Sequence, residues 1–508
     1  MTKRYYITTA IAYPNGRPHM GHAYEAIATD AIARFKRLEG FDVRFLTGTD
    51  EHGLKIAQAA KAAGIEPRAY VDGTSQPFID LDRQLGISFD RFIRTTDDDH
   101  KALCQQLWQR MADKGDLYLG RYEGWYSVRD EAYYDEAELA AAEDASGKPI
   151  KLSPQGTPVE WTVEESWFFK LSAYAEPLLK LYAEQPDFIQ PTSRFNEMRT
   201  FVAGGLSDLS MSRTSFDWGV PVPGSPGHVM YVWVDALANY LTGAGGLDGE
   251  WWPADLHVIG KDVVRFHTIY WPAFLMSAGI ALPRAVFGHG FVLNRGVKMS
   301  KSDGNVVDPA EMADRFGVDR LRWFLLREVA FGEDGSYSDE AIIERTNADL
   351  ANGIGNLAQR ALSMVAKNLG GAMPGPGPTE GADALTESMK TLTIAYFGAM
   401  AGLQLHRALE AVMAMVTAAN GYFAENAPWK LAKTDEIAMA HVLHATLDAT
   451  RRIVLLVQPF VPEASSALLD QLGVAADSRN FSDFNVIVST GTQLPVPQGV
   501  FPRWAGPA

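Results

Sequence analysis

Two short segments of the chain combine histidine, glycine, lysine and serine in spacings that suit phosphate chemistry. In the first, residues 18–22 read Pro-His-Met-Gly-His. His19 and His22 lie three positions apart, so on a helix both rings can face one ligand and donate hydrogen bonds to phosphate oxygens. Gly21 lets a nucleotide approach the backbone between them. Taken alone, this spacing fits a pair of ordinary capping or surface histidines equally well.

The second segment reads Lys-Met-Ser-Lys-Ser over residues 298–302, after Gly296 and before Asp-Gly-Asn. Lys298 and Lys301 could neutralise the charge that builds on phosphate oxygens during group transfer, and a flexible loop would let them close over the site. We assign Ser300 to the same ATP-binding loop. The alternative is a solvated lysine loop, but the position of this segment after the histidine segment favours the functional interpretation.

The elements that must position these residues read as a parallel α/β sheet. Residues 6–13 and 43–47 predict buried strands, and Gly40 ends the helix between them. The apolar face of that helix is formed by Ile27, Ala31, Phe35 and Leu38. Because strand, helix and strand at this spacing form a βαβ unit, the histidine segment lies at the carboxyl end of a strand, where open sheets bind ligands. The start of the helix adds free backbone N–H groups for phosphate.

A second set of strands predicts that the sheet comes in two halves. These strands are expected at residues 231–234, 256–260 and 285–288. Between the halves, residues 117–227 are rich in Trp, Tyr, Glu and Pro with short strand-like runs, which indicates an inserted domain. From about residue 308 the chain reads as mostly helical, with residues 370–382 as an exposed loop inside the helical part.

With both segments and this order of elements, the sequence resembles the class I aminoacyl-tRNA synthetases. Their "HIGH" element matches residues 19–22, with Met20 in place of isoleucine, and their "KMSKS" loop matches residues 298–302 in full. The resemblance to the methionyl family extends over essentially the whole chain. It implies an α/β fold in which a split Rossmann catalytic domain carries a connective-peptide insertion and precedes an α-helical anticodon-binding bundle. The implied segments are the Rossmann halves 1–117 and 228–307, the insertion 118–227, a stem-contact region 308–345 and the anticodon-binding domain 346–508.

The resemblance also implies a methionine pocket. Asp50, in the Thr-Asp-Glu-His-Gly of residues 49–53, matches the carboxylate that holds the substrate ammonium. The matching lining residues are Ala10, Ile11, Tyr13, Trp233, Ala236, Tyr240, Val263, His267 and Tyr270. Aromatic rings suit a thioether, because its sulfur gains from contact with them. Without the resemblance, plain core packing would be the better interpretation of each aromatic residue.

The implied reaction has two steps. The carboxylate of methionine, ionised at neutral pH, attacks the α-phosphorus of ATP and pyrophosphate leaves. The ribose hydroxyl of the terminal tRNA adenosine then attacks the adenylate. His19 and His22 would stabilise the phosphates, while Lys298 and Lys301 would hold the leaving pyrophosphate together with Mg²⁺. The implied partners are methionine and both initiator and elongator tRNA(Met).

For tRNA recognition, the resemblance implies a helix over residues 347–360 despite its two glycines. Asn352, Asn356 and Arg360 would share one face, where amide and guanidinium groups can read splayed-out anticodon bases. Trp429, in Ala-Pro-Trp-Lys, matches the stacking tryptophan of the family. Without the resemblance, a solvated polar face and a buried tryptophan would be the better interpretation.

No zinc is expected. The chain has one cysteine, Cys104, which we expect to be a small buried apolar residue. Family members often carry zinc knuckles in the insertion, but Ser127 and Asp130 stand where cysteines would be expected, and the later arm near residues 152–156 also lacks a thiol. We expect aromatic packing to hold the knuckle instead, among Trp125, Tyr126, Tyr133, Tyr134 and Trp161.

The composition constrains partners and location. A net charge of −16 by itself argues mildly against a nucleic-acid partner, so contact with tRNA must rest on a local basic patch. No apolar stretch could span a membrane and no signal peptide is recognisable, so we expect a cytoplasmic protein; the end at Ala508 favours a monomer. Two alternatives stay open: another class I synthetase, for valine, isoleucine, leucine or cysteine, and a tRNA-binding protein that has lost catalysis.

Overall fold

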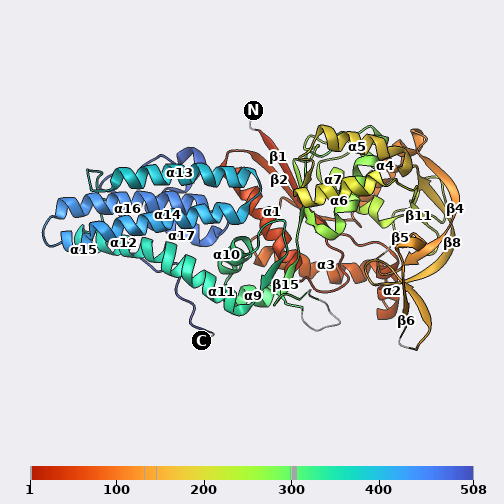
Figure 1. Ribbon diagram of the computed structural model, residues 1–508, viewed down its shortest axis with the longest axis horizontal. Coiled ribbons are helices and arrows are strands. Elements are labelled where there is room, and N and C mark those ends of the chain that lie inside the picture. The colour runs from red at the N-terminus through yellow and green to blue at the C-terminus, as the bar shows by residue number, and fades with distance from the viewer. Residues whose placement is uncertain (1–2, 131, 145, 298, 300–305, 507–508) are drawn as a thin grey trace.

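The chain folds into two parts that lie side by side along one axis, as Figure 1 shows. The computed structural model describes residues 3–506 apart from residues 131, 145, 298 and 300–305. One part holds a parallel sheet and an antiparallel one, and the other is a bundle of long helices. The expected α/β architecture with a helical C-terminal part is confirmed.

The central sheet is parallel throughout, with the strand order β3-β2-β1-β13-β14-β9. Its strands are β1 (Arg4–Thr9), β2 (Asp42–Thr49), β3 (Arg91–Arg94), β9 (Ile189–Gln190), β13 (Leu256–Gly260) and β14 (Val286–His289). The succession of strands reverses between β1 and β13, where Ile7 pairs with Leu256. A reversal of this kind leaves a crevice at the carboxyl ends of the strands, and ligands bind there in open α/β sheets.

Helix α1 (Met20–Leu38) follows β1 and packs against the sheet. Ile27, Ala31 and Phe35 on its predicted apolar face are at most 2% exposed. Gly40 follows its end with φ 88°, a left-handed conformation that glycine adopts without a steric penalty. The other helices beside this sheet are α2 (Leu54–Ala63), α3 (Pro67–Gln84), α4 (Asp98–Asp113), α7 (Val232–Gly243) and α8 (Trp271–Ala278).

Two predicted strands were wrong in type or length. Residues 231–234 lead into helix α7 instead of forming a strand. Nearly all of α7 is buried, its polar Asn239 included, so the apolar run has no exposed face that would reveal a helical period. The first strand ends at Thr9, and residues 10–13 leave the sheet apart from one bridge between Ala12 and Thr49.

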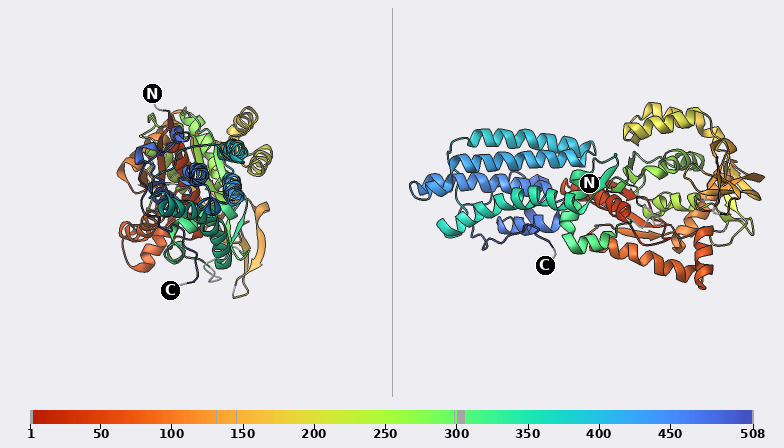
Figure 2. Two further views of the ribbon diagram at one scale, coloured as in Figure 1. Left: turned by 90° about the vertical axis from the view of Figure 1, so that its left-hand side faces the viewer. Right: turned by 60° about the horizontal axis from the view of Figure 1, so that its bottom comes forward.

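The predicted insertion is built on an antiparallel sheet with the order β5-β4-β8-β7-β6, seen in orange at one end of the molecule in Figures 1 and 2. Its strands are β4 (Leu117–Ser127), β5 (Ala132–Tyr134), β6 (Ala140–Glu143), β7 (Pro149–Leu152) and β8 (Pro158–Phe169). The chain returns through α5 (Ala175–Glu184), α6 (Thr192–Ala203), β10 (Leu209–Ser210), β11 (Ser212–Arg213) and β12 (Val229–Met230). Strand β9 also belongs to this segment but adds to the central sheet.

The rest of the chain is mostly helical. The connecting region holds β15 (Val292–Asn294), α9 (Pro309–Phe316), α10 (Val318–Glu328), β16 (Gly335–Tyr337) and α11 (Asp339–Thr346). The bundle holds a π-helix (Asn347–Gly355) and the α-helices α12 (Asn356–Asn368), α13 (Ala382–Ala401), α14 (Leu405–Asn426), α15 (Pro428–Leu431), α16 (Glu436–Val457) and α17 (Pro462–Gln471). Residues 370–382 form the predicted loop, but it is not fully exposed, because Met373 is buried at 4% exposure.

A buried ion pair joins the two parts. Arg322 of α10 donates to Asp30 of α1 at 2.6 Å, and both side chains are fully buried. The same guanidinium also donates to the carbonyls of Pro459 and Phe460, where α16 ends. Because removal of either partner would leave a buried charge without its counterion, this contact fixes the helical part against the central sheet.

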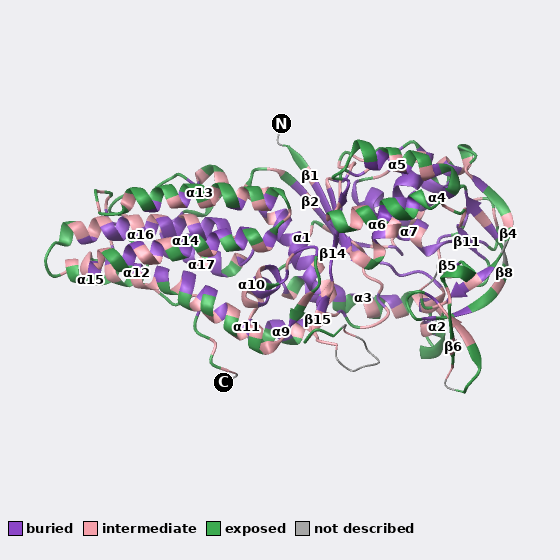
Figure 3. Cartoon of the chain, in the orientation of Figure 1, coloured by how far each residue is buried: buried purple, intermediate pink, exposed green. Residues whose placement is uncertain are grey.

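The apolar interior runs without a break from α1 through α10 into the bundle, as the purple segments of Figure 3 show. Exposed residues cover the outer faces of the long helices. Among the described residues, no helix is both long and apolar enough to cross a membrane.

Candidate active site

An open cleft of about 220 Å³ lies at the carboxyl ends of β1, β2, β13 and β14. The cleft is lined by residues 9–13 after β1, by His19, Gly21, His22 and Glu25 of the α1 region, and by Gly260, Asp262 and Val263 after β13. Its position is the one that the strand reversal predicts.

His19 and His22 together build the start of α1. The His19 ring lies 3.8 Å from the His22 ring, stacked with an angle of 25° between the planes. Nδ1 of His19 accepts a hydrogen bond from the backbone N–H of Gly21, and Nδ1 of His22 accepts one from the backbone N–H of His19, both at 3.1 Å. Helix capping and a role toward a ligand are therefore not alternatives for this pair.

The capping hydrogen bonds fix the protonation pattern of both rings. A nitrogen that accepts a hydrogen bond carries no proton, so each neutral ring has its proton on Nε2. Both residues line the cleft. A Cβ on Gly21 would lie 3.0 Å from two atoms of the His19 ring, so a larger residue there would force the ring to shift.

Acidic groups in the cleft were missed by sequence reasoning. Glu25 accepts a hydrogen bond from the backbone N–H of Ala10 at 3.0 Å and lies 2.9 Å from Nε2 of His289. Burial would lower the pKa of His289, but contact with Glu25 raises it overall. Asp262 follows Gly260, where a Cβ would collide with the Asp262 carboxylate at 2.6 Å. A glycine two residues before an acid at a strand end was the available signal for Asp262.

The predicted lysine loop lies largely outside the described part of the structure. Its functional candidates Lys298, Ser300 and Lys301 are all among the residues that are not described. Its entry is described. A turn at Arg295 and Gly296 follows β15, and the Gly296 backbone N–H donates to Ser336 Oγ at 2.9 Å. After the loop, Asp308 caps α9 and its carboxylate lies 3.9 Å from Arg17, which precedes the histidine segment. The two ends of the loop are thus anchored beside the cleft.

The residues predicted to bind methionine fall into two groups. Ala10, Ile11, Tyr13 and Val263 line the cleft directly. Asp50 is 8% exposed and follows β2, and its backbone N–H donates to the carbonyl of Ala12 at 2.8 Å. Asp50 therefore lies next to the segment that forms the cleft wall.

The remaining predicted residues form an aromatic cluster behind Val263. Trp233 stacks on Phe266 with centroids 3.7 Å apart, and Tyr270 meets Phe266 edge-on at 5.4 Å. The Tyr240 hydroxyl lies 2.6 Å from Nε2 of His267. Ala236, on the same helix as Trp233, is 4% exposed. Phe266 was not among the predicted residues, although it precedes His267 directly.

His267 is neutral in this cluster. Burial lowers its pKa to about 4. Its Nδ1 lies 2.9 Å from the Val263 carbonyl and so carries the proton, which leaves Nε2 to accept from Tyr240. The residues Phe266–Tyr270 form a π-helical turn, a feature that often occurs at functional sites.

Comparison with known protein families shows which family the chain belongs to. A family model described as "tRNA synthetases class I (M)" matches residues 5–362, and one described as "Anticodon binding domain of methionyl tRNA ligase" matches residues 373–505. The chain belongs to the methionyl family of class I tRNA synthetases. It is 56% identical over 513 residues to a methionine–tRNA ligase of Mesorhizobium japonicum, with 99% of this chain and 98% of that protein covered.

Solved structures of methionyl-family members agree with this assignment. A Mycobacterium tuberculosis methionyl-tRNA synthetase in complex with methionyl-adenylate superposes with a TM-score of 0.96 at 56% identity, covering 99% of this chain and 100% of the other. The apo form of that synthetase gives a TM-score of 0.90 at 52% identity, with 100% and 99% covered.

Two of the expected anticodon residues, Arg360 and Trp429, lie close together in the bundle. The Arg360 guanidinium of α12 lies 5.6 Å from the Trp429 ring of α15 and 4.7 Å from the Phe423 ring. Trp429 is 42% exposed, so the alternative of a buried tryptophan is wrong. Asn352 and Asn356 are exposed on the same helical run. Asn352 lies within the π-helix (Asn347–Gly355). Because a π-helical turn is wider than an α-helical one, the spacing between Asn352 and Asn356 differs from that of a regular α-helix.

The knuckle region differs from the expectation of aromatic packing alone. One carboxylate oxygen of Asp130 accepts hydrogen bonds from Ser153 at 2.7 Å, from Tyr134 at 3.0 Å and from Thr157. Ser127 lies 2.7 Å from Thr157 through their hydroxyl oxygens. Aromatic packing is present as well, because Trp125 meets Trp161 edge-on at 5.4 Å. The side chain of Tyr133 lies outside the described part of the structure.

Proposed function

We propose that this chain activates methionine with ATP to form methionyl-adenylate and then transfers methionine to the terminal adenosine of tRNA(Met). The main support is the cleft at the strand reversal, which is lined by His19, His22 and the segment of residues 9–13 that accepts a hydrogen bond from the backbone of Asp50. A 56% identical relative binds methionyl-adenylate with the same fold. The full length of the family match makes methionine the expected substrate.

The first step needs charge stabilisation more than proton transfer. The methionine carboxylate is ionised at neutral pH and attacks the α-phosphorus without a base. His19 and His22 donate from Nε2 to phosphate oxygens, and Lys298 and Lys301 hold the departing pyrophosphate. The C–O–P bond of the adenylate forms as the bond to pyrophosphate breaks. In the second step a ribose hydroxyl of tRNA attacks the acyl carbon and AMP leaves.

Methionine is held by charge at one end and by aromatic rings at the other. The Asp50 carboxylate pairs with the substrate ammonium. The thioether lies against Tyr13, Trp233 and Tyr240, with Ala10, Ile11, Ala236, Val263, His267 and Tyr270 as the remaining wall. Because His267 already donates to Val263 and accepts from Tyr240, it holds the Tyr240 ring in one position in the wall.

Mg²⁺ enters this proposal on the phosphates of ATP, which are among its preferred ligands. Asp262 lines the cleft, and its carboxylate could supplement those phosphate ligands. The ion would share the charge of the leaving pyrophosphate. Gly21 and Ser300 complete the ATP-binding set.

We propose that the chain binds no structural zinc. Ser127, Asp130, Ser153 and Thr157 hydrogen-bond to one another where the methionyl family often carries a zinc knuckle. Hydroxyl groups are not the ligands of structural zinc, which is held by thiolates and imidazoles. Elemental analysis of chelator-washed, active protein is expected to find less than about 0.1 zinc per chain; stoichiometric zinc would contradict this part.

The anticodon of tRNA(Met), in both its initiator and elongator forms, is proposed to contact Asn352, Asn356, Arg360 and Trp429. Support comes from the exposure of Trp429 and from its contact with Arg360, which together offer a stacking surface with a positive charge beside it. We place the protein in the cytoplasm and expect a monomer. Sedimentation velocity tests the oligomeric state.

The decisive assay is ATP–pyrophosphate exchange with each amino acid in turn. Methionine is expected to support exchange at least about a thousandfold better than valine, isoleucine, leucine or cysteine. Faster exchange with one of those would identify another class I specificity. No exchange with any amino acid, while tRNA still binds, would indicate a tRNA-binding protein without catalysis.

A further inference from the structure

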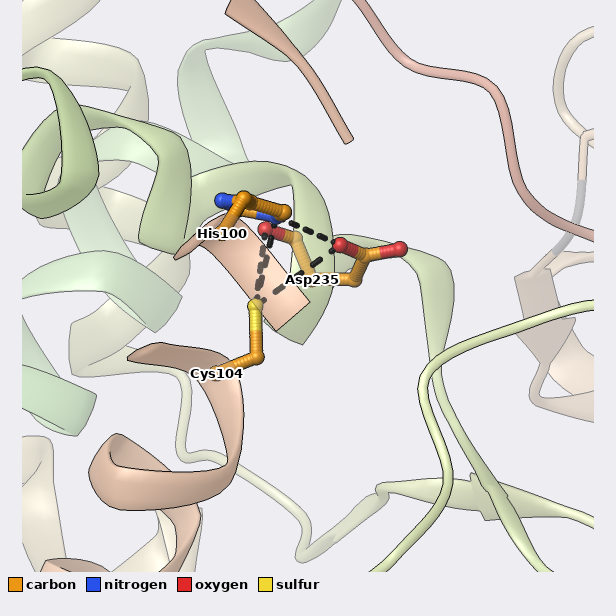
Figure 4. A group of neighbouring side chains, drawn as sticks. All are labelled: His100, Cys104 and Asp235. Carbon is orange, nitrogen blue, oxygen red and sulfur yellow. Dashed lines mark hydrogen bonds and ion pairs between the residues drawn. The ribbon is translucent and has the colours of Figure 1, made fainter. Parts of the chain in front are cut away.

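A buried charged cluster that the proposed chemistry does not use lies next to the methionine wall. Asp235 of α7 is 1% exposed and receives an imidazole on each oxygen. Nδ1 of His52 lies 2.6 Å from Oδ2, and Nε2 of His100 lies 2.7 Å from Oδ1. Figure 4 shows the His100 side of this cluster, with Cys104 one turn further along α4.

The three residues come from three elements that carry or support the methionine wall. His52 follows Asp50 by two positions, in the segment between β2 and α2. Asp235 follows Trp233 by two positions and precedes Ala236 directly, in the first turn of α7. His100 belongs to α4, which packs along α7. The cluster therefore links the carboxylate wall to the aromatic wall.

The segment with Asp50 is fixed on its other side by Glu51. The Glu51 carboxylate is fully buried and receives two hydrogen bonds from Arg94, at 2.6 Å and 3.0 Å. Trp218 donates from Nε1 to the Glu51 carbonyl at 2.7 Å and accepts from the Gly53 backbone N–H at 3.1 Å. Glu51 thus ties this segment to β3 through Arg94, and His52 ties it to α7 through its hydrogen bond to Asp235.

We infer that His52, Asp235 and His100 are positioning residues, which set the distance between the Asp50 carboxylate and the Trp233 indole and thereby the affinity for methionine. The inference rests on the proposed function. Two ring N–H donors hold the carboxylate in one orientation, so the first turn of α7 cannot rotate without breaking a charged hydrogen bond. An apolar contact in the same place would not fix that direction.

Electrostatics are consistent with an ionised Asp235. Burial by itself would raise the pKa of this carboxyl, but the adjacent His52 and His100 hold it well below its usual range. His100 is fixed in turn, because its Nδ1 lies 3.0 Å from Thr242 Oγ1. A buried carboxylate that loses one donor costs more free energy than the hydrogen bond itself contributes. Removing one histidine is therefore expected to disturb the position of Asp235.

The same atoms also lie at distances that would suit a transition metal. Ligand atoms of His100, Cys104 and Asp235 are all within 4.8 Å of one another. Hydrogen bonds already account for this geometry, because His100 Nε2 is bonded to Asp235 and lies 3.2 Å from Cys104 Sγ. We therefore assign hydrogen bonding to the cluster, and stoichiometric metal that is lost in Cys104→Ala would overturn the assignment.

The test compares variants of the full-length protein in ATP–pyrophosphate exchange. His52→Leu removes the N–H donor, whereas His52→Asn places an amide N–H where Nδ1–H stands. His52→Leu is expected to raise KM for methionine about tenfold or more while KM for ATP changes less than about twofold, and His52→Asn to recover most of the difference. Cys104→Ala is the matched control, with both constants within about twofold of wild type.

Equal methionine KM values in wild type and His52→Leu would overturn the inference. So would a parallel rise of both KM values that His52→Asn does not reverse, because a purely structural defect behaves in that way. If His52→Leu does not fold, His100→Leu and His100→Gln replace the pair, since glutamine keeps a donor near the position of Nε2. Absence of methionine-dependent exchange in the wild type would instead refute the proposed function.

Discussion

The His19 and His22 rings stack with their centroids 3.8 Å apart and together cap the start of α1. Nδ1 of His19 accepts from the backbone N–H of Gly21, and Nδ1 of His22 accepts from the backbone N–H of His19. This arrangement separates two duties within each imidazole. Nδ1 holds the helix, while Nε2–H is the donor that we propose for the phosphate. The two duties can therefore be removed one at a time by substitution.

His22→Asn is expected to keep the cap and lose the donor, because the asparagine oxygen can take the position of Nδ1. Pyrophosphate exchange should fall by about 10²- to 10³-fold with little change in Tm. His22→Gln should show the reverse pattern, with a smaller loss of rate and a loss of about 1 kcal/mol in stability. Equal rates in both variants, measured beside their thermal unfolding, would argue against an Nε2 donor.

We expect Asp82 to make ATP binding dependent on pH. Burial, with help from the carboxylates of Asp30 and Glu25, raises its pKa to about 7, and the side chain lines the cleft. Below that pH the group is neutral, and above it a negative charge faces the phosphates. KM for ATP is expected to rise about threefold to tenfold between pH 6 and pH 8. Asp82→Asn should abolish this rise; an identical pH profile in the variant would contradict the assignment.

His267 lowers stability in acid. Its pKa is about 4 in the folded protein, against about 6.5 when unfolded, so between these values only the unfolded chain binds the proton. The contribution of His267 is fully present above pH 6.5 and declines by about 1.4 kcal/mol per unit as the pH falls toward 4. Urea unfolding of wild type and His267→Gln at pH 7.5, 6.5 and 5.5 tests this. The variant should lose about 1 kcal/mol less from pH 6.5 to 5.5, and parallel losses would count against it.

Trp429→Ala should separate the two steps of the reaction. Trp429 lies at the end of the bundle away from the cleft, so amino-acid activation does not depend on it (Figure 1). Loss of one stacked base contact is expected to raise KM for tRNA by about tenfold or more while exchange stays within about twofold of wild type. Leu431→Ala on the same short helix serves as a control. Unchanged aminoacylation in Trp429→Ala would remove this residue from the interface.

The sequence was most informative where local periodicity and a single turn residue specify an element. Helix α1 and its end at Gly40 follow from a regular apolar face and one glycine. Helix α7 could not be predicted in the same way, since burial on all sides removes the polar face on which the helical period depends. The reversal between β1 and β13 follows from pairing between distant residues, which no local pattern specifies.

The candidate site shows the same division. His19 and His22 were identifiable from spacing, yet their shared cap required the backbone geometry of α1. Glu25 and His289 meet across a long stretch of chain, and neither has a local signature. The serine and threonine residues that surround Asp130 have no local signature in the sequence, and only the fold of the insertion brings them together.

The central claim is that the nucleotide lies over His19 and His22 with a thioether beside Trp233 and Tyr240. A crystal structure of this protein with a non-hydrolysable methionyl-adenylate analogue tests it most directly. The expected density places the phosphate analogue within about 3.2 Å of both Nε2 atoms and the methionyl side chain against the aromatic cluster. Density for the analogue at any other location, with this cleft open, would contradict the account.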